Sequence, residues 1–174
     1  AQLVEHDKKF IIIGNVNAIT YKEVFKLIHN NQIWLGPSIH SGDREFRVPD
    51  HYPLKAAGFR VDENGVKYLR IKGVRWFTNL DFKQRHETLT LYRQYEPNTY
   101  PHYDNFDAIN IDKVAEIPYN YAGVMGVPIT FLDKHNPDQF EIIKFRKGDD
   151  DKDLTINGKT PYFRILIKHK GAAK

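Results

Sequence analysis

The clearest pattern near the start of the chain is a short apolar run, followed by a polar loop and an amphipathic helix. Residues 10–13 are β-forming and lack polar alternation, which is typical of a strand buried on both faces. Thr20 and Glu23 have the spacing of a capping box, which predicts a helix that begins at Tyr21 and ends near residues 30–31. The segment is therefore expected to be one half of a β-α-β unit.

The loop between this strand and helix is a candidate binding site. Gly14, Asn15 and Asn17 follow the strand, and ligands of open α/β sheets bind beyond the carboxyl ends of strands. The two carboxamides offer hydrogen-bond donors and acceptors without charge. The alternative interpretation is that both asparagines only shape a turn.

Beyond residue 31 the pattern predicts mainly strands that are joined by turns. Asn64-Gly65 marks the turn of a hairpin within residues 59–71. Residues 36–58 are punctuated by proline and glycine, so they are expected to form a long irregular loop. Further strands are expected at residues 32–35, 73–81, 88–92, 122–132 and 140–145, with a second hairpin within 154–167.

Residues 67–86 form the most basic stretch of the chain, and aromatic residues are interleaved with the cations. The basic residues are Lys67, Arg70, Lys72, Arg75, Lys83, Arg85 and His86, and the aromatic ones are Tyr68, Trp76, Phe77 and Phe82. Nucleic-acid surfaces need cations for phosphates and ring faces for unstacked bases. The alternative is a twisted sheet that places its cations in solvent and its aromatic rings in the core.

Composition removes several classes of function. The 174 residues include no cysteine, which excludes disulfides, thiolate metal sites and a thiol nucleophile. Apolar runs are far shorter than a membrane span, so we expect a cytoplasmic protein without membrane partners. The net charge of +4 and a pI near 9.1 are compatible with a nucleic-acid partner without establishing one.

One acidic segment resembles a metal cluster at first sight. It contains His102, Asp104, Asp107 and Asp112, but their spacing matches no calcium loop. We therefore expect Asx-turn or surface roles for these residues and predict no metal site.

A metal-dependent nuclease is an alternative class of enzyme. Asp50 lies upstream of Asp81-Phe82-Lys83, which gives the outline of two metal-binding carboxylates and a lysine that activates water. This interpretation requires Asp50 to lie on a strand inside the proline-rich loop. Magnesium-dependent nicking of DNA would distinguish it.

Four long strings of residues occur in an order that resembles one known family. They are FIIIGNVNAITYKE (10–23), GVRWFTNLD (73–81), YPHYDNFDAIN (100–110) and GVPITFLDKHNP (126–137). Together they resemble the EcoRI-type adenine-specific DNA methyltransferases, and the resemblance extends from Lys9 to about Ile143.

The resemblance implies methyl transfer from S-adenosylmethionine to the exocyclic amine of a flipped-out adenine in double-stranded DNA. Such enzymes hold this weakly nucleophilic amine with a carboxamide and a proline carbonyl, and they stack the flipped base on an aromatic ring. The implied fold class is α/β, with a Rossmann-like sheet and added DNA-recognition elements.

The chain departs from the family pattern in two motifs. It has no glycine-rich cofactor loop after a first strand, and no Asp/Asn-Pro-Pro-Phe/Tyr motif. We therefore expect the C-terminal part of such an enzyme, with no confident catalytic residue, no tightly bound cofactor and no activity on its own. Residues 1–35 would be the remnant of the methyltransferase core, and residues 36–174 a β-rich remainder with the target-recognition elements.

Site residues follow from the resemblance in two groups. The expected rim of the target-base or cofactor site comprises Asn15, Asn17, Trp76, Phe77 and Asn79. The expected DNA contacts are Arg70, Lys72, Arg75, Lys83, Arg85 and His86. Tyr103, Asn105 and Asn110 are further candidates for reading base edges.

Only one ring of the adjacent pair Trp76 and Phe77 can face the cleft if the strand is regular, and the sequence does not choose between them. An exposed edge of the incomplete sheet would favour a homo-oligomer. Two non-enzyme alternatives remain: a stand-alone DNA-binding module without catalysis, and a structural domain without DNA affinity.

Overall fold

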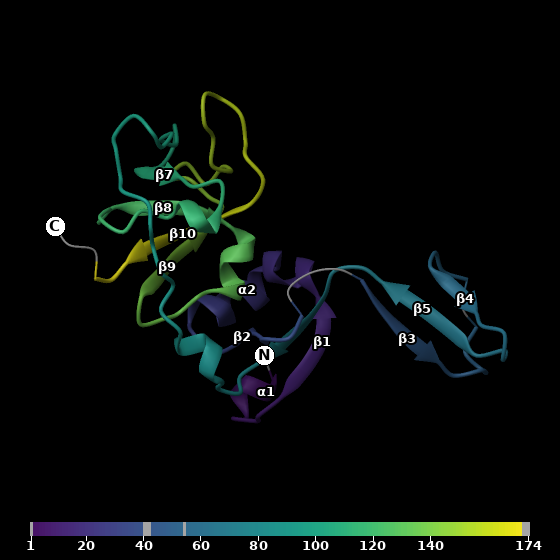
Figure 1. Ribbon diagram of the computed structural model, residues 1–174. Helices are drawn as coiled ribbons and strands as arrows, with labels where there is room; N and C mark the ends of the chain where they lie inside the picture. Colours follow the sequence, from purple (N-terminus) through teal and green to yellow (C-terminus); the bar gives the residue numbers. More distant parts are fainter. Residues whose placement is uncertain (1, 40–42, 54, 172–174) are drawn as a thin grey trace. The chain divides into compact units, whose positions relative to one another are not determined.

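The computed structural model describes residues 2–39, 43–53 and 55–171 (Figure 1). The chain divides into two compact units. The N-terminal unit comprises residues 1–28 and 32–80, and the C-terminal unit comprises residues 29–31 and 81–174. The boundary expected after residue 35 falls inside the N-terminal unit, because β6 (Val74–Thr78) pairs with β1 (Ile11–Asn15) and β2 (Trp34–Leu35), which both precede that boundary.

A three-stranded sheet and two helices begin the N-terminal unit. Its elements are α1 (Gln2–Glu5), β1 (Ile11–Asn15), the 3₁₀ helix η1 (Val16–Thr20), α2 (Lys22–His29), β2 (Trp34–Leu35) and β6 (Val74–Thr78). The strand order is β1-β6-β2, and β6 is antiparallel to both neighbours. The strands β1 and β2 therefore run parallel on either side of β6, with α2 connecting them. This is the β-α-β relation that the sequence predicts.

The start of β1 differs from expectation. Ile11, Ile12 and Ile13 are 58%, 43% and 49% exposed, so the prediction of a strand buried on both faces is wrong for this structure. The exposure means that the faces of β1 are only partly covered, and β1 is also an edge strand with β6 as its only partner among the described residues. The capping box expected at Thr20 and Glu23 is also replaced by another contact. The Thr20 hydroxyl donates to the carbonyl oxygen of Asn17 at 2.8 Å.

A second antiparallel sheet lies between β2 and β6 in the sequence. It consists of β3 (Arg44–Val48), β4 (Phe59–Val61) and β5 (Lys67–Ile71) in the order β3-β5-β4. The predicted hairpin within 59–71 is confirmed, and Asp62 fixes its turn by accepting from the backbone N–H groups of Asn64 and Val66. The expectation of an irregular segment over 36–58 is wrong for β3, because pairing with β5 orders residues 44–48.

The C-terminal unit contains a four-stranded sheet with a fully buried centre. Its strands are β7 (Ala108–Asn110), β8 (Val124–Pro128), β9 (Phe140–Phe145) and β10 (Arg164–His169), in the order β7-β8-β10-β9. Three 3₁₀ helices accompany it: η2 (Lys83–His86), η3 (Val114–Glu116) and η4 (Ile129–Asp133). The side chains of Ile109, Met125, Ile165 and Ile167 form the interior.

One expected strand of this unit is absent, and a side chain forms hydrogen bonds with its backbone instead. Residues 88–92 form no strand, but the Gln139 carboxamide accepts from the Leu89 N–H at 2.7 Å and donates to the Leu89 carbonyl at 2.8 Å. A glutamine thus satisfies the backbone groups that a neighbouring strand would pair. The hairpin expected within 154–167 is likewise reduced to a tight turn between Ile156 and Lys159, because β10 pairs with β8 and β9 instead.

The observed architecture is a mixed α/β fold, as the sequence predicts at this coarse level. Among the described residues, no helix is both long and apolar enough to span a membrane.

Candidate functional site

The loop after β1 is held by its own asparagine. The Asn15 side-chain oxygen accepts from the Asn17 N–H at 2.9 Å, and the Asn15 amide donates to the Lys72 carbonyl at 3.0 Å. Gly73 has a φ of 64° and accepts at its carbonyl from the Val16 N–H, which closes the loop against the start of β6. The turn-shaping interpretation therefore describes Asn15, whereas Asn17 is exposed and available to a ligand.

Trp76 and Phe77 point to opposite faces of the first sheet. Phe77 is 6% exposed and pairs with Ile12 in the β1–β6 register, whereas Trp76 pairs with Ile13 and is half-buried. A Cβ added to Gly36 would lie 2.9 Å from the Trp76 Cβ, so glycine permits this close packing. The structure thus separates the two rings: one belongs to an interior face, and the other keeps partial access to solvent.

An apolar cavity of about 530 Å³ lies on the Phe77 face of the N-terminal unit. It is lined by Gln2, Leu3, Val4, Phe10, Ile12, Gly14, Ala18, Val24, Leu27, Ile33 and Phe77, and none of these carries a charge. Such a lining suits apolar side chains and offers no positive charge to a phosphate or carboxylate.

Asn79 has a structural role that uses both ends of its carboxamide. Its oxygen accepts from the Phe10 N–H at 3.0 Å, and its nitrogen donates to the Lys8 carbonyl at 2.8 Å. These bonds extend the β1–β6 ladder by side-chain pairing. Contact between Asn79 and a base would require these two hydrogen bonds to break.

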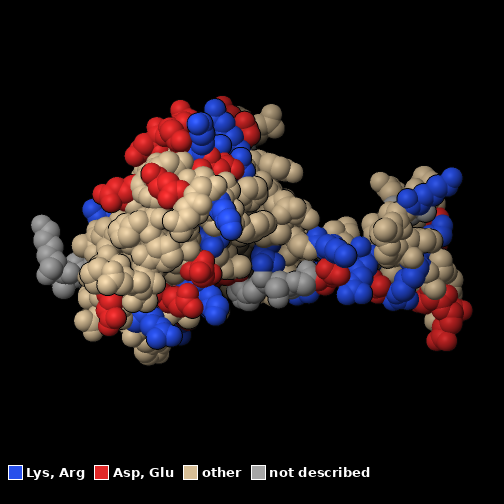
Figure 2. Space-filling model, turned by 90° about the horizontal axis from the view of Figure 1, so that it is seen from above, with Lys and Arg blue, Asp and Glu red and all other residues tan. Residues whose placement is uncertain are grey.

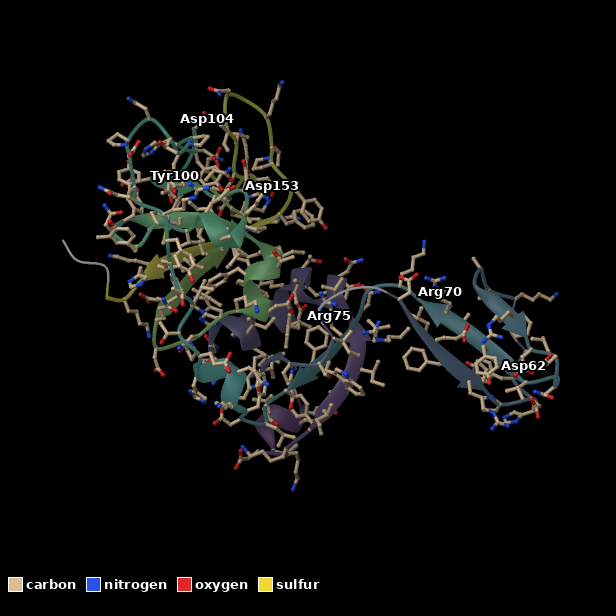
Figure 3. All side chains as sticks on the ribbon, viewed as in Figure 1. Asp62, Arg70, Arg75, Tyr100, Asp104 and Asp153 are labelled. Carbon is tan, nitrogen blue, oxygen red and sulfur yellow. The ribbon has the colours of Figure 1, made fainter. Side chains whose placement is uncertain are left out.

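The predicted DNA contacts of the N-terminal unit differ in accessibility. Arg70 and Lys72 are exposed at the end of β5, and Arg70 forms an ion pair with Asp43 at 2.9 Å. Arg75 (Figure 3) is only 6% exposed, and one guanidinium nitrogen donates to the Val74 carbonyl. A phosphate contact through Arg75 would require its side chain to be uncovered.

The predicted DNA contacts of the C-terminal unit share one short helix, η2. Lys83 and His86 are exposed, and His86 lies 2.7 Å from an Asp81 carboxylate oxygen, which lowers the pKa of Asp81. Arg85 points inward to the Asn31 side-chain oxygen, and burial lowers the pKa of its guanidinium. Lys83 and His86 are therefore the accessible members of this group.

Tyr103 and Asn110 lie in the interior of the C-terminal unit, which corrects their proposed role in base reading. The Tyr103 hydroxyl donates to the Asn110 side-chain oxygen at 2.8 Å, and Arg164 donates to the same oxygen at 3.0 Å. Asp112 accepts from both Asn110 and Arg164. Burial of this network raises the pKa of Tyr103.

Asn105 also has a structural role, and it bridges loops. Its amide donates to an Asp150 carboxylate oxygen and to the Asp153 carbonyl, while its oxygen accepts from the Thr155 N–H. Asp104 accepts from the N–H groups of Asn157 and Gly158 at 3.0 and 2.8 Å (Figure 3), a turn-capping role of the kind expected from its sequence. Among the described residues, no three His, Asp or Glu side chains are placed to hold a metal ion.

Two exposed arginines lie outside the DNA contacts that the sequence predicts. Arg47 and Arg60 lie on β3 and β4, on the same face as Arg70. The signal that was available is the alternation Arg44-Glu45-Phe46-Arg47-Val48, which is typical of a strand with one polar face.

Comparison with known proteins decides the family. The family described as "Adenine-specific methyltransferase EcoRI" matches residues 1–170 of the 174-residue chain. This chain belongs to that family. The type II methyltransferase M.EcoRI of Escherichia coli is 58% identical over 175 residues, which cover 99% of this chain and 54% of M.EcoRI.

More distant relatives show the same partial coverage. M.MpnI of Mycoplasma pneumoniae is 33% identical over 189 residues, covering 97% of this chain and 59% of the relative. M.MgeORF184P of Mycoplasma genitalium is 32% identical over 191 residues, which cover 95% of this chain and 58% of the relative. The chain thus spans somewhat more than half the length of these type II methyltransferases. No solved structure matches it significantly.

Proposed function

We propose that this chain is the C-terminal, DNA-contacting part of a site-specific adenine DNA methyltransferase. The intact enzyme would transfer a methyl group from S-adenosylmethionine to the exocyclic amine of adenine in double-stranded DNA. The observation that carries the proposal is the family match over residues 1–170, together with coverage of only 54% of M.EcoRI. The host of such an enzyme is bacterial, so we expect it to work in the cytoplasm.

The chemistry of the cavity supports a division of labour in which this chain contacts DNA and the remainder of the enzyme binds the cofactor. A site for S-adenosylmethionine must satisfy an amino-acid head group and ribose hydroxyls, which need polar partners. The cavity of the N-terminal unit is lined by one polar side chain, Gln2, and by no charged residue, so it offers too few polar partners for this cofactor. We therefore assign cofactor binding to the remainder of the enzyme and expect no tight binding by this chain alone.

The accessible residues fit DNA contact. Trp76 is our candidate for the ring against the flipped adenine, since Phe77 is buried on the cavity face. Asn17 is the candidate polar group on the rim, and Arg70, Lys72, Lys83 and His86 are the candidate phosphate contacts.

The exposed isoleucines of β1 favour part of a larger protein over a stand-alone DNA-binding module. Three adjacent isoleucines on an edge strand would otherwise promote association. In the isolated chain, we propose that this edge pairs with a second copy and forms a homo-oligomer.

The test compares binding with catalysis. The purified chain is incubated with unmethylated duplex DNA and labelled S-adenosylmethionine, with intact M.EcoRI as the positive control. We expect salt-dependent binding of the duplex without methyl transfer. Methyl transfer by the chain alone would disprove the division of labour, and absence of duplex binding at low salt would disprove the DNA-contacting role.

A further inference from the structure

The β3-β5-β4 sheet has two chemically different faces. The register places Glu45 opposite Arg70, and Arg47 opposite Tyr68, with Arg60 opposite Tyr68 on the other side. These residues form one face, which we call the arginine face. The opposite face is mainly apolar: it contains Phe46, Val48, Phe59, Val61, Leu69 and Ile71, with Arg44 and Lys67 at its ends.

Two of the three arginines on the arginine face are held in fixed positions. Arg60 donates to both oxygens of Glu45, at 2.8 and 2.6 Å, and its guanidinium lies 4.4 Å from the centre of the Tyr68 ring. Arg70 is paired with Asp43 at 2.9 Å. A forked ion pair restricts a long side chain and presents its remaining N–H groups in one direction.

Arg47 differs from the other two arginines. It is exposed, and within the described part of the chain it forms no ion pair. It lies on the edge strand β3, opposite Tyr68 of the middle strand β5. All five N–H donors of this guanidinium are therefore available to a partner.

The charge of the sheet favours an anionic partner. Its arginine face contains three arginines and one glutamate, and Lys72 follows directly after β5. Figure 2 shows Lys and Arg side chains along this sheet, together with Asp and Glu side chains; the sheet is at the right of the picture, as in Figure 1. An acidic protein and DNA both meet this requirement, but the sheet geometry favours DNA, because proteins that read DNA with β-ribbons or β-sheets place strands in its grooves.

We propose that the arginine face enters the major groove of duplex DNA, with Arg47 contacting base edges and Arg60 and Arg70 contacting the flanking phosphates. A guanidinium binds the O6 and N7 atoms of guanine with two parallel hydrogen bonds, which suits the unpaired Arg47. Arg60 and Arg70, whose side chains are already held by ion pairs, suit phosphates, because phosphate contacts orient the protein on the duplex and do not read its sequence. The inference rests on the proposed function, because it names the element that reads the DNA of the same enzyme.

The test uses two duplexes of the same sequence, one of which carries glucosylated 5-hydroxymethylcytosine. The C5 substituent fills the major groove without changing the phosphates. We expect the wild-type chain to bind the glucosylated duplex about tenfold more weakly, equivalent to the loss of one good base contact. Arg47→Gln should bind the plain duplex about tenfold more weakly and should no longer distinguish the two.

Lys26→Gln is the matched control, since it removes one exposed positive charge from α2. It should retain wild-type affinity and discrimination. Circular dichroism checks that each variant is folded, and Arg60→Gln provides a second variant that should lose affinity for both duplexes.

The outcomes separate this inference from the function on which it rests. Equal affinity of the wild type for both duplexes, with Arg47→Gln unchanged, would overturn the major-groove assignment but leave the DNA-contacting role intact. Failure to bind any duplex at low salt would overturn both. Equally tight binding of polyglutamate that is lost in Arg47→Gln would indicate an acidic protein partner and would also overturn the assignment.

Discussion

The Tyr103 hydroxyl donates to the Asn110 side-chain oxygen at 2.8 Å, inside the C-terminal unit and close to the backbone of β8. A Cβ added to Gly126 would lie within van der Waals overlap of this hydroxyl, so a glycine is required where the phenol crosses β8. Arg164 donates to the same oxygen of Asn110 at 3.0 Å. The string YPHYDNFDAIN therefore contributes a buried hydrogen-bond network in this structure.

Removal of the Tyr103 hydroxyl should destabilise the C-terminal unit. Tyr103→Phe keeps the ring but removes one donor to Asn110, for which we expect a loss of about 1 kcal/mol in the free energy of unfolding. Urea denaturation measures this difference. Tyr162→Phe removes a hydroxyl from an exposed ring and is the control; equal stabilities of the two variants would contradict the assigned hydrogen bond.

Acid should weaken the C-terminal unit through His135. Burial lowers the pKa of His135 from 6.5 to about 4, so the unfolded chain binds a proton more readily than the folded one between these values. Stability is then complete above about pH 6.5 and falls as the pH decreases toward 4. Urea midpoints measured across this range should decrease.

His135→Gln should flatten this pH dependence, since glutamine does not titrate. Burial also lowers the pKa of His169, so His169→Gln is the matched variant for the other shifted histidine of the unit. If the pH dependence survived in His135→Gln and disappeared in His169→Gln, the assignment to His135 would be wrong.

Self-association should depend on the exposed edge of β1. Ile13→Lys places a charge among the exposed isoleucines and should shift the isolated chain toward monomer, because charged side chains block strand pairing at a sheet edge. Light scattering after size-exclusion chromatography, over a range of concentrations, measures the change. Tyr21→Lys alters another exposed residue and should leave the oligomer intact. A wild-type chain that is monomeric at every concentration would refute this edge-pairing proposal.

Salt dependence should separate exposed phosphate contacts from a buried arginine. Lys72→Gln and Lys83→Gln should each reduce the slope of log Kd against log salt by about one, as expected for one lost phosphate contact. Arg75→Gln should instead lower the unfolding free energy, because its side chain is buried. A reduced slope in a stably folded Arg75→Gln would show that Arg75 reaches DNA after all.

Local chemistry explains what the sequence predicts well. Asn64-Gly65 identifies its hairpin because a tight turn needs residues that tolerate positive φ, and Gly65 has a φ of 79°. The strand–helix–strand relation of β1, α2 and β2 follows from apolar periodicity. Both signals lie within short segments of the chain.

The features that the sequence does not predict depend on distant partners. Arg75 lies in a basic stretch that predicts an exposed cation, yet its side chain is buried on the same face of the sheet as Phe77. The strand β3 follows prolines and glycines, and its order comes from β5, more than twenty residues later. Likewise, the run of isoleucines in β1 predicts buried side chains. Whether they are buried depends on which element packs against β1, and the local sequence does not give that information.

The ends of the β3-β5-β4 sheet have a consequence for how such enzymes diversify. Arg44 and Ile71 are register partners at one end of this sheet, so the paired part of the segment between β2 and β6 begins and ends at neighbouring points. An insertion whose ends meet can be lengthened, shortened or exchanged without altering the pairing of β2 with β6. Evolution can therefore treat this segment as a replaceable cassette, and a chimaera that carries a relative's version of residues 44–71 should still fold.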